Sequence, residues 1–380
     1  MQDIEFKDFI TLQRGFDLPE HSRVNGEVPV VASTSISGFH NIAKVSAPGV
    51  VTGRSGALGE VQYIDKDFWP LNTTLWVKDF KNNEPKYVYY LLKTLDLKRF
   101  NSGAGVPTLN RNDLDTLKIQ VHEKNEQKII AKVLSNYDDL IENNNKRIKI
   151  LEEMAQKIYK EWFVDFKFPN YETATFKQTE LGEIPSDWKV VKLKDVLNSI
   201  KETTKAGEHL KGLKYVPIDC IPRKSFYLTT SENYKNAQSS LILFKKSDIL
   251  FGNMRSYFHK VIMAPFDGIT RTTCFVLRPK DNIYKSWAYL TMFQDSTVAY
   301  STQHSKGATI PYSFWEGGLA EMAIILPSTK IIQEFSNIVN PMLEIIQRSY
   351  FKQEVLKQTR DLLLPRLISG EIDVEDMEVL

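Results

Sequence analysis

The sequence predicts an α+β fold with two α/β-mixed modules separated by two long antiparallel coiled-coil helices, arranged as a pseudo-two-fold tandem repeat. Three observations predict this fold. A heptad pattern runs through a long stretch without Gly or Pro, a second heptad pattern follows near the C-terminus, and matching features recur about 200 residues apart. The 380 residues exceed what one hydrophobic core usually accommodates and fit several domains.

The composition predicts a soluble globular protein rather than a membrane or secreted one. Apolar residues make up 42% of the chain and charged residues 25%. No apolar run is long enough to span a membrane, and the acidic N-terminus is unlike a signal peptide. Cys220 and Cys274 form neither a metal-type spacing nor a disulfide framework. We therefore expect a cytoplasmic location, no membrane partner and no bound metal.

The first module is expected over residues 1–122. Short strand-like runs alternate there with glycine-rich turns, and a helical stretch follows at residues 86–99. A polar loop of small residues then covers residues 101–110. The module carries 14 Lys and Arg against 14 Asp and Glu, a net charge of zero.

The first long helix is expected over residues 123–165. Alternating steps of four and three give a seam in which Asn144 is the polar exception. At about 1.5 Å per residue, the uninterrupted stretch would be roughly 55 Å long. Because so narrow a seam cannot bury itself, it needs a partner helix. The seam positions are Ile130, Leu134, Tyr137, Ile141, Asn144, Ile148, Leu151, Ile158 and Trp162.

A linker is expected over residues 166–187 and a second module over residues 188–327. The second module repeats the order of the first: strand-like runs, a helical stretch, and a loop of small residues before a proline. It carries 19 Lys and Arg against 11 Asp and Glu, a net charge of +8. This imbalance indicates a polyanionic partner for the second module.

The second long helix is expected over residues 328–370, followed by a tail at 371–380. An offset of 205 residues carries the first seam onto the second and places Ser349 at the level of Asn144. Pro341 removes a backbone donor, so we predict that the helix bends or a short helix ends there. Parallel pairing would strain the linker, which favours the antiparallel arrangement. The seam positions are Val339, Met342, Ile346, Ser349, Leu356 and Leu363.

Such a coil would act as a spacer between the modules. Its length corresponds to about one to one and a half turns of B-DNA at roughly 34–36 Å per turn. Two modules held at that distance would read a split DNA sequence.

Candidate DNA-contacting residues are polar and cationic side chains on expected loops, because these side chains match the donors and acceptors of base edges and phosphates. In the first module they are Arg14, Ser33, Thr34, Ser35, His40, Arg54, Ser55, Lys98, Arg99, Asn101 and Arg111. In the second they are Asn253, Arg255, Ser256, Tyr257, Arg271, His304, Lys306 and Thr309. The alternative for Arg54 is a tight turn with a solvated side chain. For Lys98, Arg99, Asn101 and Arg111 it is a charged helix end.

Motifs of an active site are missing from the sequence. Asn340-Pro341 continues with Met342 rather than with the second proline of a DNA methyltransferase motif. The glycine-rich stretch at 53–59 lacks the Gly-Lys-Ser/Thr ending of a phosphate-binding loop. We therefore expect no catalytic residues in this chain.

The chain resembles the specificity subunits of type I restriction–modification enzymes. The resemblance covers the whole chain and rests on the duplicated layout and on three stretches: KEWFVDF at 160–166, LGEIPSDW at 181–188 and LLPRLISGEID at 363–373. The first module departs from the pattern because it lacks a lead-in like that at 181–188.

The resemblance implies two target-recognition domains, each reading one half of a bipartite, asymmetric site on double-stranded DNA. It also implies binding of two modification (methyltransferase) subunits, which recruit ATP-dependent restriction subunits with translocase and nuclease activity. S-adenosylmethionine, ATP and Mg²⁺ would then belong to the partner subunits, and this chain would carry no cofactor. The alternatives are a coiled-coil protein-interaction scaffold without DNA specificity and a stand-alone nuclease or methyltransferase.

Overall fold

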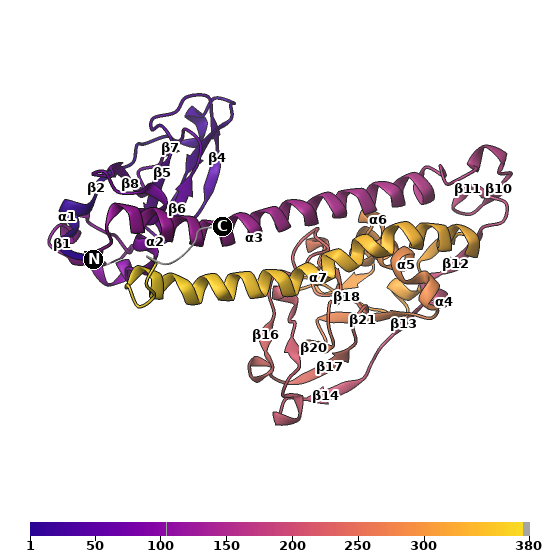
Figure 1. Cartoon of the computed structure of the whole chain (residues 1–380). Coiled ribbons are helices and arrows are strands. Elements are labelled where there is room, and N and C mark those ends of the chain that lie inside the picture. The colour runs from indigo at the N-terminus through magenta and orange to yellow at the C-terminus, as the bar shows by residue number, and fades with distance from the viewer. Residues whose placement is uncertain (104, 375–380) are drawn as a thin grey trace. The chain divides into compact units, whose positions relative to one another are not determined.

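The computed structural model describes residues 1–103 and 105–374 and divides into two compact units. The first unit contains Met1–Ile141 together with the chain from Val355 onward, and the second contains Glu142–Glu354. Each unit combines one module with a part of each long helix, α3 (Lys124–Tyr159) and α7 (Thr329–Ile368), as Figure 1 shows. In the described part of the chain, no helix is long and apolar enough to cross a membrane.

The first unit contains three sheets. A four-stranded sheet has the order β2-β8-β5-β6, a three-stranded sheet has the order β4-β3-β7, and β1 pairs antiparallel with β9. The pairing of β3 with β7 is parallel, and the other pairings are antiparallel. The strands are β1 (Gln2–Glu5), β2 (Thr11–Arg14), β3 (Val28–Val31), β4 (Ile36–His40), β5 (Gly49–Gly53), β6 (Val61–Ile64), β7 (Trp69–Pro70), β8 (Thr74–Asp79) and β9 (Lys118–Val121).

The core of the first unit joins its sheet to both long helices. Helices α1 (Phe6–Phe9) and α2 (Pro85–Thr94) supply buried aromatic residues, and α2 begins with a proline, whose fixed φ suits the first helical turn. Ile130 and Leu134 of α3 pack in the same cluster as Leu364 and Leu367 of α7. The module therefore folds onto the helices rather than standing apart from them.

The second unit contains a four-stranded sheet, a five-stranded sheet and three two-stranded pairs. A four-stranded sheet has the order β13-β21-β18-β19, and a five-stranded sheet has the order β14-β17-β20-β15-β16. Three antiparallel pairs are β12 with β24, β10 with β11, and β22 with β23. The strands are β10 (Phe176–Thr179), β11 (Gly182–Pro185), β12 (Lys189–Lys192), β13 (Leu197–Ser199), β14 (Thr203–Lys205), β15 (Lys214–Tyr215), β16 (Glu232–Asn233), β17 (Ser240–Phe244), β18 (Ile249–Gly252), β19 (Val261–Met263), β20 (Gly268–Arg271), β21 (Cys274–Pro279), β22 (Ser305–Lys306), β23 (Tyr312–Ser313) and β24 (Ala323–Leu326).

A buried carboxylate ties α3 to the second module. Helices α4 (Leu193–Val196), α5 (Lys285–Met292) and α6 (Asp295–Gln303) complete this module. One carboxylate oxygen of Glu152 accepts hydrogen bonds from the backbone N–H groups of Phe226 (2.6 Å) and Tyr227 (3.0 Å) and from the Ser225 hydroxyl (2.8 Å). Burial raises the pKa of Glu152, and these hydrogen bonds oppose that rise. Sequence analysis did not single out this residue.

The strand orders confirm the tandem repeat. The sheet β2-β8-β5-β6 corresponds to β13-β21-β18-β19, and β4-β3-β7 corresponds to β16-β15-β20, including the parallel pairing in each. The pair β1-β9 corresponds to β12-β24. Strands β14 and β17 have no counterpart among the described residues of the first unit and enlarge the second module. The two modules are therefore copies of one topology.

The two long helices pair antiparallel within the second unit. Asn145 of α3 accepts a hydrogen bond from Gln353 of α7 at 2.7 Å, and farther along α3 the ring of Tyr159 lies 6.2 Å from that of Phe335. Residue numbers therefore rise along α3 while those of the partners fall. The two helices also meet in the first unit, where Arg360 Nη1 lies 2.6 Å from Asp138 Oδ1. The antiparallel pairing predicted from the seams is confirmed.

Two expectations for connecting segments turned out differently, and a third lies mostly outside the described residues. Helix α7 runs unbroken through Pro341, so the predicted helix end is wrong, and the alternative, a bend, stays a prediction. The neighbouring Val339 and Leu343 are buried, and their packing stabilises the helix where the proline lacks a donor. The segment expected as a linker contains the hairpin β10-β11, and it leads into Trp188, which is fully buried against Phe168. Of the expected tail, residues 375–380 lie outside the described residues.

Candidate nucleic-acid interface

A tight corner follows the strand-ending Gly53 in the first unit. Three backbone hydrogen bonds hold it. Arg54 N donates to Thr73 O at 2.9 Å, Gly56 N to Pro107 O at 3.1 Å, and Leu109 N to Arg54 O at 2.8 Å. The corner thereby joins the ends of β5 and β8 to the loop of small residues.

The second unit repeats this corner bond for bond. Asn253 N donates to Thr273 O at 3.0 Å, Arg255 N to Pro311 O at 2.8 Å, and Ser313 N to Asn253 O at 2.9 Å. Asn253 thus occupies the place of Arg54, and Arg255 occupies the place of Gly56. We call this shared arrangement the corner frame. Its loops were predicted to correspond from the 204-residue offset between Pro107 and Pro311.

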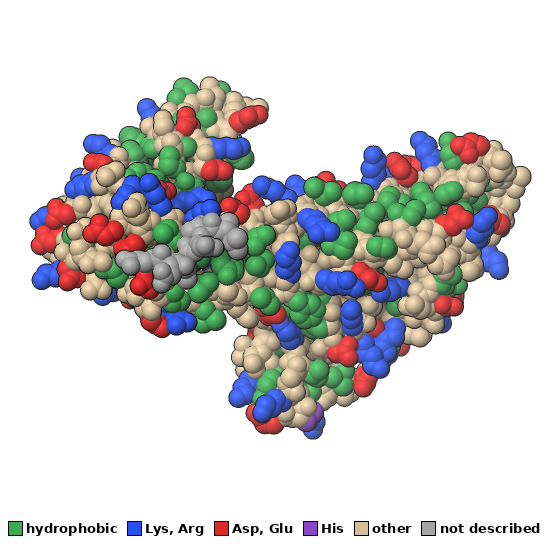
Figure 2. Space-filling view, viewed as in Figure 1, with side chains coloured by type: hydrophobic (Ala, Val, Ile, Leu, Met, Phe, Trp, Pro, Cys, Tyr) green, Lys and Arg blue, Asp and Glu red, His purple; other side chains and the backbone are tan. Residues whose placement is uncertain are grey.

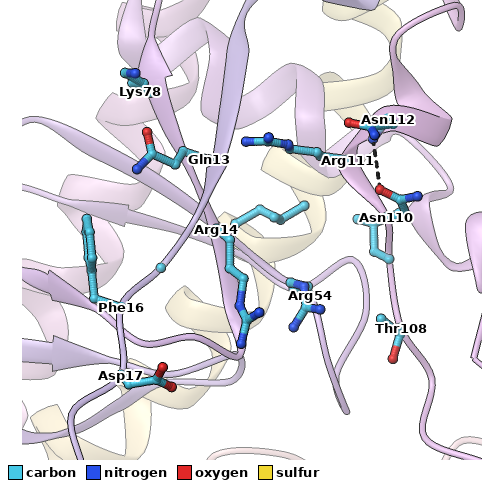
Figure 3. A pocket seen from close by; sticks show the side chains of 13 residues that line it. Gln13, Arg14, Phe16, Asp17, Arg54, Lys78, Thr108, Asn110, Arg111 and Asn112 are labelled. Carbon is cyan, nitrogen blue, oxygen red and sulfur yellow. Dashed lines mark hydrogen bonds between the residues drawn. The ribbon is translucent and has the colours of Figure 1, made fainter.

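A pocket of about 910 Å³ opens beside the corner frame of the first unit. Four cationic side chains line it: Arg14, Arg54, Lys78 and Arg111. Figure 3 shows that the three arginines project from separate segments of the chain. The other lining residues are Gln13, Gly15, Phe16, Asp17, Leu75, Thr108, Leu109, Asn110 and Asn112.

The electrostatics of this pocket favour an anion. Asp17 is the one acidic lining residue, and its carboxylate accepts a hydrogen bond from the side chain of Asn72. Arg54 and Arg111 donate to the backbone carbonyls of Asn72 and Leu12, both at 3.3 Å. In residues 1–103 and 105–374, none of the four cations forms an ion pair with a carboxylate. Four positive charges against one negative charge in one hollow suit a phosphate-bearing ligand.

The corresponding corner of the second unit borders a pocket of about 640 Å³ with different chemistry. Its walls are largely aromatic and aliphatic and include Phe275 and Trp315, whose ring centroids lie 6.3 Å apart. Of its two lysines, Lys201 forms an ion pair with Glu316 at 2.5 Å, and Lys306 lies over the ring of Phe314. This pocket therefore presents apolar surface with little uncompensated charge.

The predicted contact residues of the first module fall into three groups. Arg14, Arg54 and Arg111 come together in the pocket, and Ser55 bridges to Thr108 in the corner frame. Lys98 and Arg99 are exposed on a short helical turn, and Asn101 uses its side-chain oxygen to accept from the backbone of Gly103 and Thr108. Ser33, Thr34 and Ser35 form the turn between β3 and β4, where the latter two are exposed.

His40 was predicted to lie on an exposed loop, but it is buried at the end of β4. It is only 5% exposed, its Nδ1 accepts a hydrogen bond from Val24 N at 3.0 Å, and its ring packs edge-on against Trp69. The residue closes a strand end. Its burial follows from the alternation of β4, which turns position 40 inward, and this argues against base contact.

The predicted residues of the second module are also divided. Tyr257, Arg271, His304, Lys306 and Thr309 are exposed, and the ring of His304 stacks on Tyr300 with centroids 4.0 Å apart. Arg255 is half-buried with a left-handed φ of 52°, and its Nη2 lies 3.5 Å from Thr309 O.

Asn253 and Ser256 are buried parts of the loop scaffold rather than exposed readers. Asn253 donates to Thr272 O at 3.0 Å, and the Ser256 hydroxyl pairs with that of Ser313 at 3.2 Å. The sequence could not distinguish these two residues from their exposed neighbours, because polar side chains that close loops have the same composition as those that bind ligands.

The seam residues lie inward on both helices. Ile130, Leu134, Ile141, Asn144, Ile148, Trp162, Val339, Ile346 and Ser349 are buried, and Tyr137, Leu151, Ile158, Met342, Leu356 and Leu363 are half-buried. Asn144 is 8% exposed, and Ser349 donates to the carbonyl of Ile345 within its own helix. The polar bond between the helices in this region joins their neighbours Asn145 and Gln353.

Several residues of the first pocket and of the loops of small residues were not predicted from the sequence. Lys78 and Gln13 line the first pocket, and Val106 and Ile310 stand exposed on the loops of small residues. The 204-residue offset between the two prolines was the available signal for the last two, since each directly precedes its proline.

Comparison with known proteins gives two matches to one family model. The model, described as type I restriction modification DNA specificity domain, matches residues 1–153 and 185–350. The MjaIX specificity subunit of Methanocaldococcus jannaschii, a type I restriction enzyme subunit, is 30% identical over 334 residues, which cover 81% of this chain and 74% of the relative. The HindI specificity subunit of Haemophilus influenzae is 23% identical over 357 residues, covering 76% and 77%.

Among solved structures, the S subunit of a type I restriction–modification system from M. genitalium has a similar fold. The TM-score is 0.66 at 16% sequence identity, and the match covers 96% of this chain and 95% of the other.

Proposed function

Because the chain belongs to the family of type I restriction–modification DNA specificity domains, we propose that it reads a bipartite, asymmetric site on double-stranded DNA, one half-site per module. It is a DNA sequence-recognition subunit, and the family match leaves the alternative of a protein scaffold without DNA specificity unsupported. Activity in this family's systems would come from other subunits, and this chain would select the sequence at which they act.

The duplicated corner frame is the observation that supports a bipartite DNA site. The same three backbone bonds place residues 54–56 in one module and residues 253–255 in the other. In the first module the frame adjoins a pocket with four cations, which suits contact with phosphates and guanine edges. In the second module exposed Arg271, Lys306 and Thr309 surround the frame. Two similar frames with different side chains are suited to reading two different half-sites.

The long helices offer surface for the partner subunits. Helix α3 exposes Leu140, Ile150 and Met154, and α7 exposes Ile338, Phe351, Val355 and Leu362. Figure 2 shows hydrophobic side chains among charged ones on the visible face of the molecule. We propose that two modification subunits dock on these helices, bind S-adenosylmethionine and methylate adenine. Restriction subunits that use ATP and Mg²⁺ would join them.

Mapping methylated bases in the host genome tests this function. The expected result is methylation at a split sequence with an unread spacer, which disappears when the gene for this chain is deleted. A purified chain with its modification subunits should bind a duplex carrying both half-sites more tightly than a duplex in which either half-site is scrambled. Equal binding to all three duplexes would contradict the proposal.

A further inference from the structure

The loops of small residues present an aliphatic side chain to solvent at the same position in both modules. Their sequences correspond at an offset of 204 residues, with Gly103 and Pro107 aligned to Gly307 and Pro311. The residue before each proline is Val106 in the first loop and Ile310 in the second. Val106 is 60% exposed and Ile310 is 44% exposed.

The two loops hold these side chains outward by the same means. A Cβ on Gly103 would lie 2.0 Å from the carbonyl oxygen of Val106, and one on Gly307 would lie 2.8 Å from that of Ile310. Only glycine permits so close a turn. The following proline restricts the aliphatic residue to extended backbone, and its carbonyl accepts a bond of the corner frame. The position of each aliphatic side chain is therefore built into the loop.

A single exposed aliphatic residue is ordinary on a protein surface. The recurrence here is informative, because the loops diverge at the adjacent position, which is Gly105 in one and Thr309 in the other. Both copies nevertheless keep a β-branched aliphatic residue in the exposed place. Packing does not account for it, since neither side chain is buried.

The surroundings of both side chains are cationic. Lys98 and Arg99 are exposed beside the first loop, and Arg54 lies in the frame beneath it. Lys306 belongs to the second loop, and Arg255 lies 3.5 Å from the carbonyl of Thr309. An aliphatic group on a loop that carries or adjoins cationic residues fits a polyanion that displays apolar groups, and an apolar protein surface would not require these charges.

We propose that Val106 and Ile310 each contact the methyl group of a thymine, one in each half-site. This inference rests on the proposed function and specifies a contact within it. An aliphatic side chain has no donor or acceptor to offer, and the thymine C5-methyl is the apolar group on the base edges of the major groove. The neighbouring cations hold the loop against the backbone phosphates while the aliphatic side chain reaches the base.

The test uses the full-length chain and a duplex carrying the two half-sites identified by methylation mapping. Each thymine is replaced in turn by deoxyuridine, which removes only the methyl group, and affinity is measured by fluorescence anisotropy. Loss of one buried methyl contact is expected to weaken binding about fourfold. One replacement in each half-site should show this loss.

Threonine variants assign each methyl group to a side chain. Val106→Thr keeps the branched shape and exchanges one methyl for a hydroxyl. In the second loop, Ile310→Thr keeps the branch and exchanges the ethyl group for a hydroxyl. Each should weaken binding to the thymine duplex about fourfold. Each should also reduce the deoxyuridine effect in its own half-site, where threonine retains one methyl group, and leave the effect in the other half-site intact. Affinity for unrelated DNA and its salt dependence should stay unchanged, because the phosphate contacts remain.

Several results would overturn the proposal. They are a half-site without thymine, wild-type binding that no deoxyuridine replacement weakens, and threonine variants that keep the full deoxyuridine effect. Variants that lose affinity for the modification subunits instead of DNA would assign the loops to a protein partner. If the chain distinguishes its site and depends on Arg54 while the threonine variants bind normally, this inference fails and the proposed function stands. If scrambled half-sites bind equally well, the proposed function itself fails.

Discussion

The pocket of the first module concentrates four cations around the corner frame, whereas the equivalent pocket of the second module is mostly apolar, although the second module has the larger positive charge. In the second pocket the charge of Lys201 is compensated by Glu316 at 2.5 Å. The net charge of a module therefore does not indicate whether its pocket is charged. The module with no net charge holds the more basic of these two pockets.

The largest expected effect on DNA affinity comes from removing the arginine charges of the first pocket. Replacing Arg14, Arg54 and Arg111 together by Gln should lower DNA affinity about a hundredfold, because three side chains able to contact phosphates or bases are lost. If all three meet phosphates, the salt dependence should fall by about three in the slope of log K against log salt. Filter binding over a salt series measures both quantities.

The matched control lies in the other module. Lys201→Gln removes a lysine that Glu316 already compensates, so affinity should change by less than about twofold. Equal losses from the triple variant and from the control would show that the contrast between the pockets has no bearing on DNA binding.

A second contrast lies where the long helices cross. Asp138 and Arg360 form an ion pair in the first unit, reinforced by the Tyr90 hydroxyl at 2.6 Å. The repeat offset places Leu343 and Ala155, both buried, at the corresponding positions of the second unit. Arg360→Ala should destabilise the first unit by about 2 kcal/mol, because a half-buried carboxylate loses its cation.

The double variant with Asp138→Leu and Arg360→Ala copies the second unit and should recover much of this loss. Urea unfolding measured by circular dichroism compares the three proteins. A double variant that is less stable than Arg360→Ala alone would mean that the pair contributes more than a hydrophobic contact would in its place.

A third contrast concerns backbone strain within the corner frame. Gly56 and Arg255 occupy the same place, both with positive φ, at 86° and 52°. Arg255→Gly should stabilise the second unit by up to about 1 kcal/mol by relieving the strain, and it should weaken DNA binding if Arg255 contacts DNA as predicted. Thermal unfolding and anisotropy measure the two effects.

Ser239→Gly relieves a similar φ of 69° on an exposed loop of the same unit and should leave DNA affinity unchanged. If Arg255→Gly binds DNA as the wild type does, the arginine is not a contact residue.

The smallest expected effect is one in which the units behave alike. Burial lowers the pKa of His122 in the first unit and of His259 in the second below the usual 6.5, and Asp295 partly opposes this for His259. The unfolded chain then takes up protons at higher pH than the folded chain, so stability is full above pH 6.5 and declines as the pH falls below it. The free energy of unfolding at pH 7.5 should exceed that at pH 5.5 by about 1 kcal/mol or less per histidine. His122→Gln and His259→Gln should each make the free energy of unfolding depend less on pH.

Much of the architecture could be predicted because repetition and periodicity act along the chain. The heptad seams, the 205-residue offset and the loops before Pro107 and Pro311 depend on local spacing, and each has a counterpart in the fold. The buried face of α7 was only partly predicted. Phe335 and Leu343 are buried while Met342 and Leu356 are only half-buried, because the modules as well as α3 cover this helix.

The site was less predictable than the fold. A polar residue can stabilise the local backbone or bind a ligand. His40 does the former at the end of β4, and Asn253 and Ser256 do so in a loop. Lys78 was missed because it lies on β8, where strand periodicity does not indicate that a pocket adjoins its side chain. Which of these groups converge is decided by strand pairing between distant segments, which spacing alone does not specify.

The hydrogen bonds that Glu152 accepts from residues 225–227 fix the rotation of α3 about its own axis relative to the second module. Each residue of an α-helix turns the next by about 100°, so one residue inserted between Asn145 and Glu152 would swing the carboxylate away from its three donors while Gln353 still held Asn145. Insertions of seven residues, close to two full turns, would restore the angle. As far as the angle of this carboxylate is concerned, the helix can therefore change length only in steps close to whole turns.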